Sequence, residues 1–268
     1  PAGSASAQSQ TCSVSGADAA AINPAVENFR TEVSLGGGVN APGAGPFANG
    51  RRQINWDAGG LDGFQSPGFM PGDFINHNSP RGAEFNTPGS GFEDRPRPPT
   101  RQRQPADAGD LRFGDINPAF NTDFTVFSET RLFASLDSTV IDTTFYVPSD
   151  PSERATVNGF AAVFTDVDLA SVTSLKFYDI DENLLHEQFV LTADGGLSFA
   201  GALWDDGTRI GRVQMTLGDT ALADFAGIGD AVALDDLIYG EPQIVPAPAS
   251  ATLALTASGL LARRRRRS

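Results

Sequence analysis

Acidic residues give the clearest chemical signal in this sequence, because they recur in close pairs within strand-like segments. Asp166 and Asp168 are two residues apart, so they share one face of a strand ending and repel each other unless a cation lies between them. Asp235 and Asp236 are adjacent in a strand-like run, so one carboxylate must face inward and needs a partner. Two interpretations stay open. These four acids bind calcium, which prefers hard oxygen ligands, or they are satisfied by backbone amides and an arginine such as Arg212.

A second acidic group resembles the start of a calcium-binding loop. Asp179, Asp181 and Asn183 have the alternating oxygen spacing of an EF-hand, but Leu184 stands where that loop needs glycine. No glutamate follows at the twelfth position. We therefore predict a tight hairpin turn here.

Aromatic side chains are the candidates for sugar binding. Trp56 and Trp204, together with Phe69 and Phe74, could stack on a polysaccharide if they are exposed in loops. Packing in the core is the simpler interpretation, because large aromatic side chains are mostly buried.

Signals for catalysis are weak. The sequence has two histidines, His77 and His186, and neither is flanked by a nucleophile motif. Glycoside hydrolysis needs only two carboxylic acids, but with 33 acidic residues some pair always qualifies. We assign no catalytic residue and expect a non-catalytic protein.

The charge balance excludes one class of partner. The 33 acidic residues outnumber the 19 basic ones, which gives a net charge of −14. Such a surface repels phosphate backbones, so we expect no nucleic-acid binding. The single cysteine, Cys12, has no partner for a disulfide within the sequence.

Small residues at the start of the sequence match a secretion leader. Ala5 and Ala7 form an A-x-A site of the kind that signal peptidase cleaves, so we interpret residues 1–7 as a signal-peptide remnant. A disordered terminus is the alternative. Residues 8–27 are rich in alanine and serine with little periodicity, so we predict a flexible lead-in, with a short helix near residues 24–29 as its one candidate element.

The other end combines prolines, an apolar stretch and a basic run. Val245, Pro246 and Pro248 precede residues 249–262, which are mostly small or apolar. As a helix this stretch spans about 21 Å, less than the roughly 30 Å of a hydrocarbon core, so it is a marginal transmembrane anchor. The arginines that follow would stay cytoplasmic: Arg263, Arg264, Arg265, Arg266 and Arg267.

This layout resembles the PEP-CTERM sorting signal that exosortases process, although Ala247 stands where that motif usually has glutamate. The resemblance implies transient retention in the inner membrane, cleavage near Pro246 and Pro248 by an exosortase-type enzyme, and release to the cell surface or extracellular matrix. Residues 243–268 would then be a sorting tail with a short C-terminal helix. The alternative for the arginine run is a membrane or nucleic-acid patch.

The body, residues 28–242, is predicted as a mainly β, antiparallel, jelly-roll-like β-sandwich with long irregular loops. Residues 28–110 are rich in glycine, proline and asparagine and indicate loops that pack their aromatic side chains onto a sheet. Residues 111–242 show period-two alternation between turn residues. The predicted strands cover residues 124–127, 131–135, 140–147, 155–166, 174–179, 184–191, 197–203, 210–217 and 231–239.

The body also resembles an uncharacterised family of secreted bacterial proteins. The phrases that carry this similarity include residues 52–57 (RQINWD), 113–118 (FGDINP) and 235–242 (DDLIYGEP). The resemblance implies export and a β fold but no mechanism. We expect an exported structural or adhesive surface protein, with a calcium-assisted carbohydrate-binding module and a secreted polysaccharide-active enzyme as alternatives.

Overall fold

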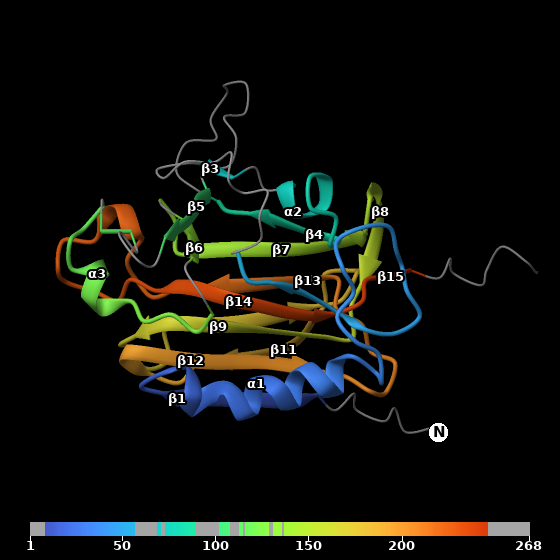
Figure 1. Cartoon of the computed structure of the whole chain (residues 1–268), viewed down its shortest axis with the longest axis horizontal. Helices are drawn as coiled ribbons and strands as arrows, with labels where there is room; N and C mark the ends of the chain where they lie inside the picture. Colours follow the sequence, from blue (N-terminus) through green and yellow to red (C-terminus); the bar gives the residue numbers. More distant parts are fainter. Residues whose placement is uncertain are drawn as a thin grey trace, which may run out of the picture.

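The computed structural model describes residues 9–56, 69–70, 73–88, 102–107, 113–114, 116–128, 131–135 and 137–245. Antiparallel strands dominate the regular structure, and they form two curled sheets that share one hydrophobic core (Figure 1). The predicted fold class, a mainly β antiparallel sandwich, is confirmed. The predicted C-terminal helix lies outside the described residues.

The first sheet has the strand order β1-β12-β9-β14-β6-β5-β3, with β2 paired to β14. Its longest pairing joins β12 to β9, next to the edge strand β1. The strands are β1 (Gln10–Gly16), β2 (Arg51–Ile54), β3 (Phe69–Met70), β5 (Gln102–Asp107), β6 (Arg131–Ser135), β9 (Gly159–Val167), β12 (Ala193–Leu203) and β14 (Ala233–Gly240).

The second sheet has the order β11-β10-β13-β7-β8-β15, with β4 paired to β7. Its strands are β4 (Ala83–Asn86), β7 (Val140–Val147), β8 (Asp150–Thr156), β10 (Ser174–Tyr178), β11 (Leu184–Phe189), β13 (Arg212–Thr216) and β15 (Gln243–Ile244). Short helical turns lie in the connections: α2 (Phe74–His77), α3 (Phe120–Asp123) and η1 (Leu222–Asp224).

The core lies between the two sheets and is dominated by phenylalanine. In β7 every second side chain is buried, which is the pattern of a strand with one face in the core. Facing residues of both sheets meet in this cluster, among them Phe133, Phe145, Phe160 and Phe177. The strand predicted over residues 140–147 from period-two alternation is therefore confirmed, with one face buried.

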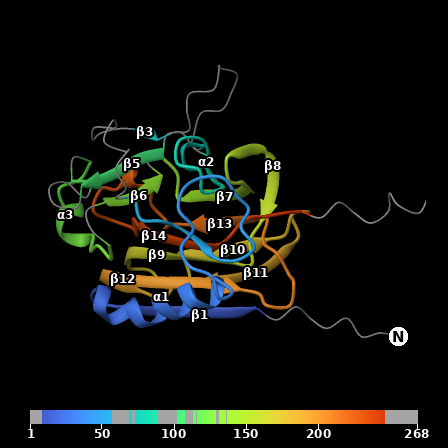
Figure 2. The same ribbon diagram turned by 45° about the vertical axis from the view of Figure 1, so that its right-hand side comes forward.

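Strand β9 is different, because all of its residues are buried. Its second face is covered by α1 (Ala19–Val33), which lies against β1 and β12 in both views (Figure 1, Figure 2). The helix presents Ile22, Val26, Phe29 and Val33, spaced four, three and four residues apart. These side chains pack on the outer face of β9 and β12, and the thiol of Cys12 on β1 packs beside them.

The prediction of a flexible lead-in over residues 8–27 is wrong. Residues 10–16 form the edge strand β1, paired with β12 over its whole length. A side-chain cap then starts α1, since Asp18 accepts a hydrogen bond from the Ala21 amide at 3.0 Å. The fold thus begins well before Asn28, the start that the sequence suggested.

The predicted irregular part, residues 28–110, contains more regular structure than its composition suggests. Strand β2 extends the first sheet beside β14, and β4 pairs with β7 in the second sheet. The aromatic side chains of Trp56 and Phe85 are buried against Phe133, as expected for loops that pack on a sheet.

Candidate functional site

The carboxylates of Asp166, Asp168 and Asp194 come together where β9 meets β12. Asp166 is near the end of β9, Asp168 follows that strand, and Asp194 is near the start of β12, its antiparallel partner. One carboxylate oxygen from each residue lies within 4.8 Å of the others. We call these three residues the Asp166 cluster. Such a group of oxygens could hold a metal ion, with Asp166 buried and the other two residues exposed.

An irregularity in β12 positions Asp166. The β9–β12 register shifts between Ala193 and Leu197, and within this shift Gly195 has a φ of +61°. The Gly195 amide consequently points at Asp166 and donates a hydrogen bond of 2.8 Å to its Oδ1. Asp166 itself has a φ of 63°, a conformation that aspartate tolerates better than most residues.

The electrostatics of the Asp166 cluster favour a cation. Burial raises the pKa of Asp166 to about 7, and the charges of Asp168, Asp123 and Asp194 act in the same direction against the Gly195 hydrogen bond. Burial and the charges of Asp194 and Asp123 also raise the pKa of Asp168. A divalent cation between these carboxylates would turn their mutual repulsion into attraction.

Asp235 and Asp236 do not join this cluster, so the four predicted calcium ligands divide into two separate groups. Although the residues are neighbours on β14, both carboxylates reach the hydroxyl of Ser128, at 2.9 and 2.8 Å. The β14–β9 register is irregular between Leu234 and Leu237, which explains why the usual alternation fails here. Of the two interpretations drawn from the sequence, hydrogen bonding is the one that the structure shows for this pair.

The partners of the two aspartates differ. The Phe127 amide donates to Asp235 Oδ2 at 2.7 Å, whereas Arg30 of α1 donates to Asp236 Oδ2 at 2.7 Å. Arg212, the arginine suggested by the sequence, instead pairs with Asp142 and Glu182. The actual partner, Arg30, lies on α1, one residue after the short helix that the sequence suggested near residues 24–29.

A second proton would relieve the repulsion between two buried carboxylates that share one hydroxyl. Ser128 can donate to only one of them, and burial followed by the charge of Asp236 raises the pKa of Asp235 well above its ordinary value. A protonated Asp235 would donate to Ser128, and Ser128 would donate to Asp236, whose charge Arg30 balances. In this arrangement the hydrogen bonds among Asp235, Ser128 and Asp236 are satisfied, and the two aspartates carry a single negative charge between them.

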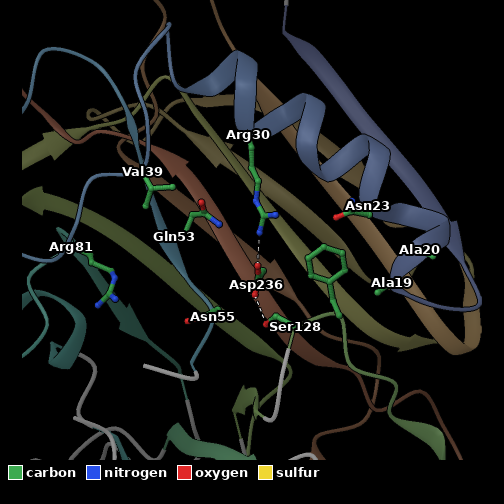
Figure 3. A pocket seen from close by; sticks show the side chains of 11 residues that line it. Ala19, Ala20, Asn23, Arg30, Val39, Gln53, Asn55, Arg81, Ser128 and Asp236 are labelled. Atoms are coloured by element: carbon green, nitrogen blue, oxygen red, sulfur yellow. Dashed lines mark hydrogen bonds and ion pairs between the residues drawn. The ribbon is translucent and has the colours of Figure 1, made fainter. Parts of the chain in front are cut away.

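A pocket of about 660 Å³ opens beside Asp236, between α1 and β2. Figure 3 shows Arg30 reaching from α1 toward Asp236, with Gln53 and Asn55 on one side of this pair. Phe127 also lines the pocket, and the Arg30 guanidinium lies 5.8 Å from the centre of its ring. We call this the α1 pocket.

The two predicted sugar-binding tryptophans are both buried, at 2% and 3% exposure, so neither presents a surface for stacking. The Trp56 indole donates to the Asp235 carbonyl at 2.7 Å and stacks on Phe133 at 4.0 Å. Trp204 packs edge-on against Phe177. Core packing, the simpler interpretation, is therefore confirmed.

The predicted hairpin at Asp179 is also confirmed. Its Oδ1 accepts hydrogen bonds from the amides of Asp181 and Asn183, both at 2.9 Å, in the turn between β10 and β11. The oxygens are thus occupied by the turn itself.

Most of the predicted processing residues lie outside the described residues: Ala5, Ala7, Pro246, Pro248, Arg263, Arg264, Arg265, Arg266 and Arg267. Val245 is the last described residue and follows β15. In the described ranges no helix has both the length and the hydropathy that a bilayer crossing requires.

Three residues of these sites were missed in the sequence: Asp194, Ser128 and Arg30. Only a weak indication in the sequence marks Asp194 as part of a site: this aspartate precedes two glycines in a break between strands. Comparison with protein-family models, curated proteins and solved structures gives no significant match, so the assignment rests on the geometry described above.

Proposed function

We propose that this chain is an exported, non-catalytic protein of the cell surface or extracellular matrix, with a structural or adhesive role, whose sandwich is stabilised by calcium at the Asp166 cluster. Export is supported by the A-x-A site and by the PEP-CTERM-like pattern of prolines, apolar residues and arginines. On this proposal an exosortase-type enzyme and the inner membrane are transient partners of the tail.

The observation that carries the calcium part is the spacing of the three carboxylate oxygens. Oxygens that each lie about 2.4 Å from one ion can be at most about 4.8 Å apart. The three oxygens of the Asp166 cluster lie within 4.8 Å of one another, which is compatible with a common ion. Water and backbone carbonyls would complete the six to eight ligands that calcium takes.

The position of the Asp166 cluster suggests a structural role. It joins the end of β9 to the start of β12, the most extensively paired strands of the first sheet. An ion there would hold the two strands together at the point where their register is irregular. A protein exported into millimolar calcium would gain stability from the ion as RT ln(1 + [Ca²⁺]/Kd).

Thermal unfolding of the full chain in 2 mM calcium and in excess EGTA tests this proposal. We expect calcium to raise the Tm by several degrees, and the Asp194→Asn variant to lose most of that rise. Asp181→Asn, which alters an exposed aspartate in the β10–β11 turn, is the matched control and should respond as the wild type does. An equal rise in the Asp194→Asn variant, or no rise in the wild type, would remove calcium from the proposal.

Export is tested separately in a bacterium that has an exosortase. A tag placed in the body should appear at the surface or in the medium with the tail removed. Replacing the five terminal arginines by serine should leave the tagged protein uncut. Cytosolic, full-length protein in both cases would reject the sorting proposal.

The structure changes the support for the two alternative functions. A calcium-assisted carbohydrate-binding role loses its tryptophan candidates, and its support moves to the α1 pocket. The third hypothesis, a secreted polysaccharide-active enzyme, gains no specific observation from the described residues.

A further inference from the structure

The α1 pocket is lined by three side-chain amides that keep hydrogen-bonding groups unused within the described residues. Asn23 on α1 and Asn55 after β2 make no side-chain hydrogen bond within the described part of the chain. Gln53 accepts from Arg51 Nε at 2.9 Å, which leaves its NH₂ group for another partner. Planar amides of this kind match the paired donors and acceptors of sugar hydroxyls.

One cation of the pocket has no carboxylate partner among the described residues. Arg30 is paired with Glu27 and Asp236, but Arg81 hydrogen-bonds only to Ser79 within the described residues. Burial lowers the pKa of Arg81, and the charge of Arg52 acts in the same direction. A half-buried guanidinium with unused N–H groups is a receptor for a carboxylate, which it binds through two parallel hydrogen bonds.

The pocket also offers an apolar wall and enough room for a small ligand. Phe127 is half-buried at the edge of the pocket, and the Arg30 guanidinium, which lies over its ring, holds the ring in place. The volume of about 660 Å³ falls within the roughly 300–1,000 Å³ that small-molecule sites occupy. An apolar ring face beside planar polar groups suits a sugar ring, which has apolar C–H faces and a polar rim.

We propose that the α1 pocket binds an acidic oligosaccharide, in which one sugar carboxylate pairs with Arg81. Its hydroxyls bond to Gln53 and Asn55 on the same side of the Arg30–Asp236 pair and to Asn23 on the other side (Figure 3). This goes beyond the structural role proposed above and does not depend on the calcium site.

The acidic net charge of the protein does not oppose such binding at short range. Screening limits charge interactions to about 8 Å at physiological ionic strength, so the charges that line the pocket dominate its potential. Those are the guanidinium groups of Arg30 and Arg81 and the carboxylate of Asp236, and Glu27 is paired with Arg30 at 2.7 Å. Arg81 is therefore the charge that faces a ligand without a carboxylate partner among the described residues, in a protein with a net charge of −14.

Isothermal titration calorimetry of the full chain with a galacturonate trimer, in the presence of EGTA, tests the inference. The methyl ester of the same trimer keeps the rings and removes the charges. We expect the acid to bind with a Kd below about 1 mM and the ester to bind about tenfold more weakly. The chelator keeps the result independent of whether calcium binds at the Asp166 cluster.

Variants assign the binding to the pocket. Arg81→Gln should weaken binding of the acid about tenfold and leave binding of the ester unchanged. Asn23→Ala, an exposed change on α1, should weaken both ligands about threefold without unfolding the protein. Arg154→Gln is the control, because it is the same substitution at an arginine that does not line the pocket.

Three outcomes would overturn the inference: no heat with either trimer up to about 10 mM, equal affinity for acid and ester, or wild-type affinity in both pocket variants. Thermal unfolding of each variant shows whether it is folded. If Arg81→Gln fails to fold, the Asn23→Ala result and the comparison of acid with ester decide the question.

Discussion

The guanidinium of Arg52 and the carboxylate of Glu241 form a buried ion pair, in which Nε and Nη2 donate to different oxygens at 2.6 and 2.7 Å. The pair ties β2 to the segment that follows β14. Glu241 also accepts from Asn40 Nδ2 and from the Phe47 amide, at 2.9 and 3.2 Å. One carboxylate thus fixes the long loop between α1 and β2 against the sandwich.

Removing one member of this pair should strongly destabilise the fold. Glu241→Ala leaves the Arg52 charge buried without compensation, so we expect a loss of about 3–5 kcal/mol in the free energy of unfolding, measured by urea denaturation. Glu187→Ala breaks the exposed ion pair with Lys176 and should cost less than about 1 kcal/mol. Similar losses in the two variants would contradict the assigned role of Glu241.

Helix α1 should contribute as much to the free energy of unfolding as a core strand does. Phe29 is buried and packs edge-on against Phe199 at 5.8 Å, so Phe29→Ala should cost about 3–5 kcal/mol. Asn28→Ala, on the exposed face of the same helix, should change stability by less than about 0.5 kcal/mol. If both variants unfold at the wild-type urea concentration, α1 is not an integral part of the fold.

The two aspartates at Ser128 should respond differently to neutralisation. Asp235→Asn imitates the protonated carboxyl and should cost less than about 1 kcal/mol at pH 7. Asp236→Asn removes the charge that balances Arg30 and should cost about 3 kcal/mol or more. Urea denaturation of both variants measures this, and the opposite order of stability would show that Asp236 carries the proton.

The Asp166 cluster predicts a pH dependence without calcium. The pKa of Asp166 is raised from 3.8 to about 7 in the folded protein, so the folded state binds its proton more tightly than the unfolded state. The resulting stability is fully present below pH 4 and is lost as the pH rises toward 7. In EGTA the wild type should therefore lose about 2 kcal/mol between pH 4.5 and 7.5 relative to Asp166→Asn, after allowance for solvent screening.

Calcium should reverse this trend, because the ion binds only the ionised carboxylates. Its affinity should rise about tenfold per pH unit below the pKa of Asp166 and level off above it. Calorimetric titration at pH 5.5, 6.5 and 7.5 measures the change, and a calcium affinity independent of pH would place the ion elsewhere.

Alternation in the sequence predicted those strands that have one face in the core, such as β7. It failed at residues 124–127, where Phe124 is buried but the segment is not a strand. There the Thr125 amide donates to the Thr165 hydroxyl and the Phe127 amide donates to Asp235, so side chains take the place of a neighbouring strand. Alternation of polar and apolar residues in the sequence does not show where side chains replace a neighbouring strand.

Strand β1 and the full length of α1 were missed for a different reason. The spacing of Ile22, Val26, Phe29 and Val33 is helical, but Pro24 and the surrounding small residues concealed it. Likewise, the closeness of Asp166 and Asp168 follows from the chain, whereas Asp194 joins them only through the pairing of β9 with β12. Long-range pairing of this kind leaves no signal near either residue.

The single thiol of the protein lies on the edge strand β1 and contacts the Gly201 carbonyl of β12 at 3.5 Å. Burial raises the pKa of Cys12 to about 12, so almost no thiolate forms while the two strands are paired. Alkylation of Cys12 by iodoacetamide should therefore proceed only when β1 detaches, and its rate reports how often that edge of the sandwich opens.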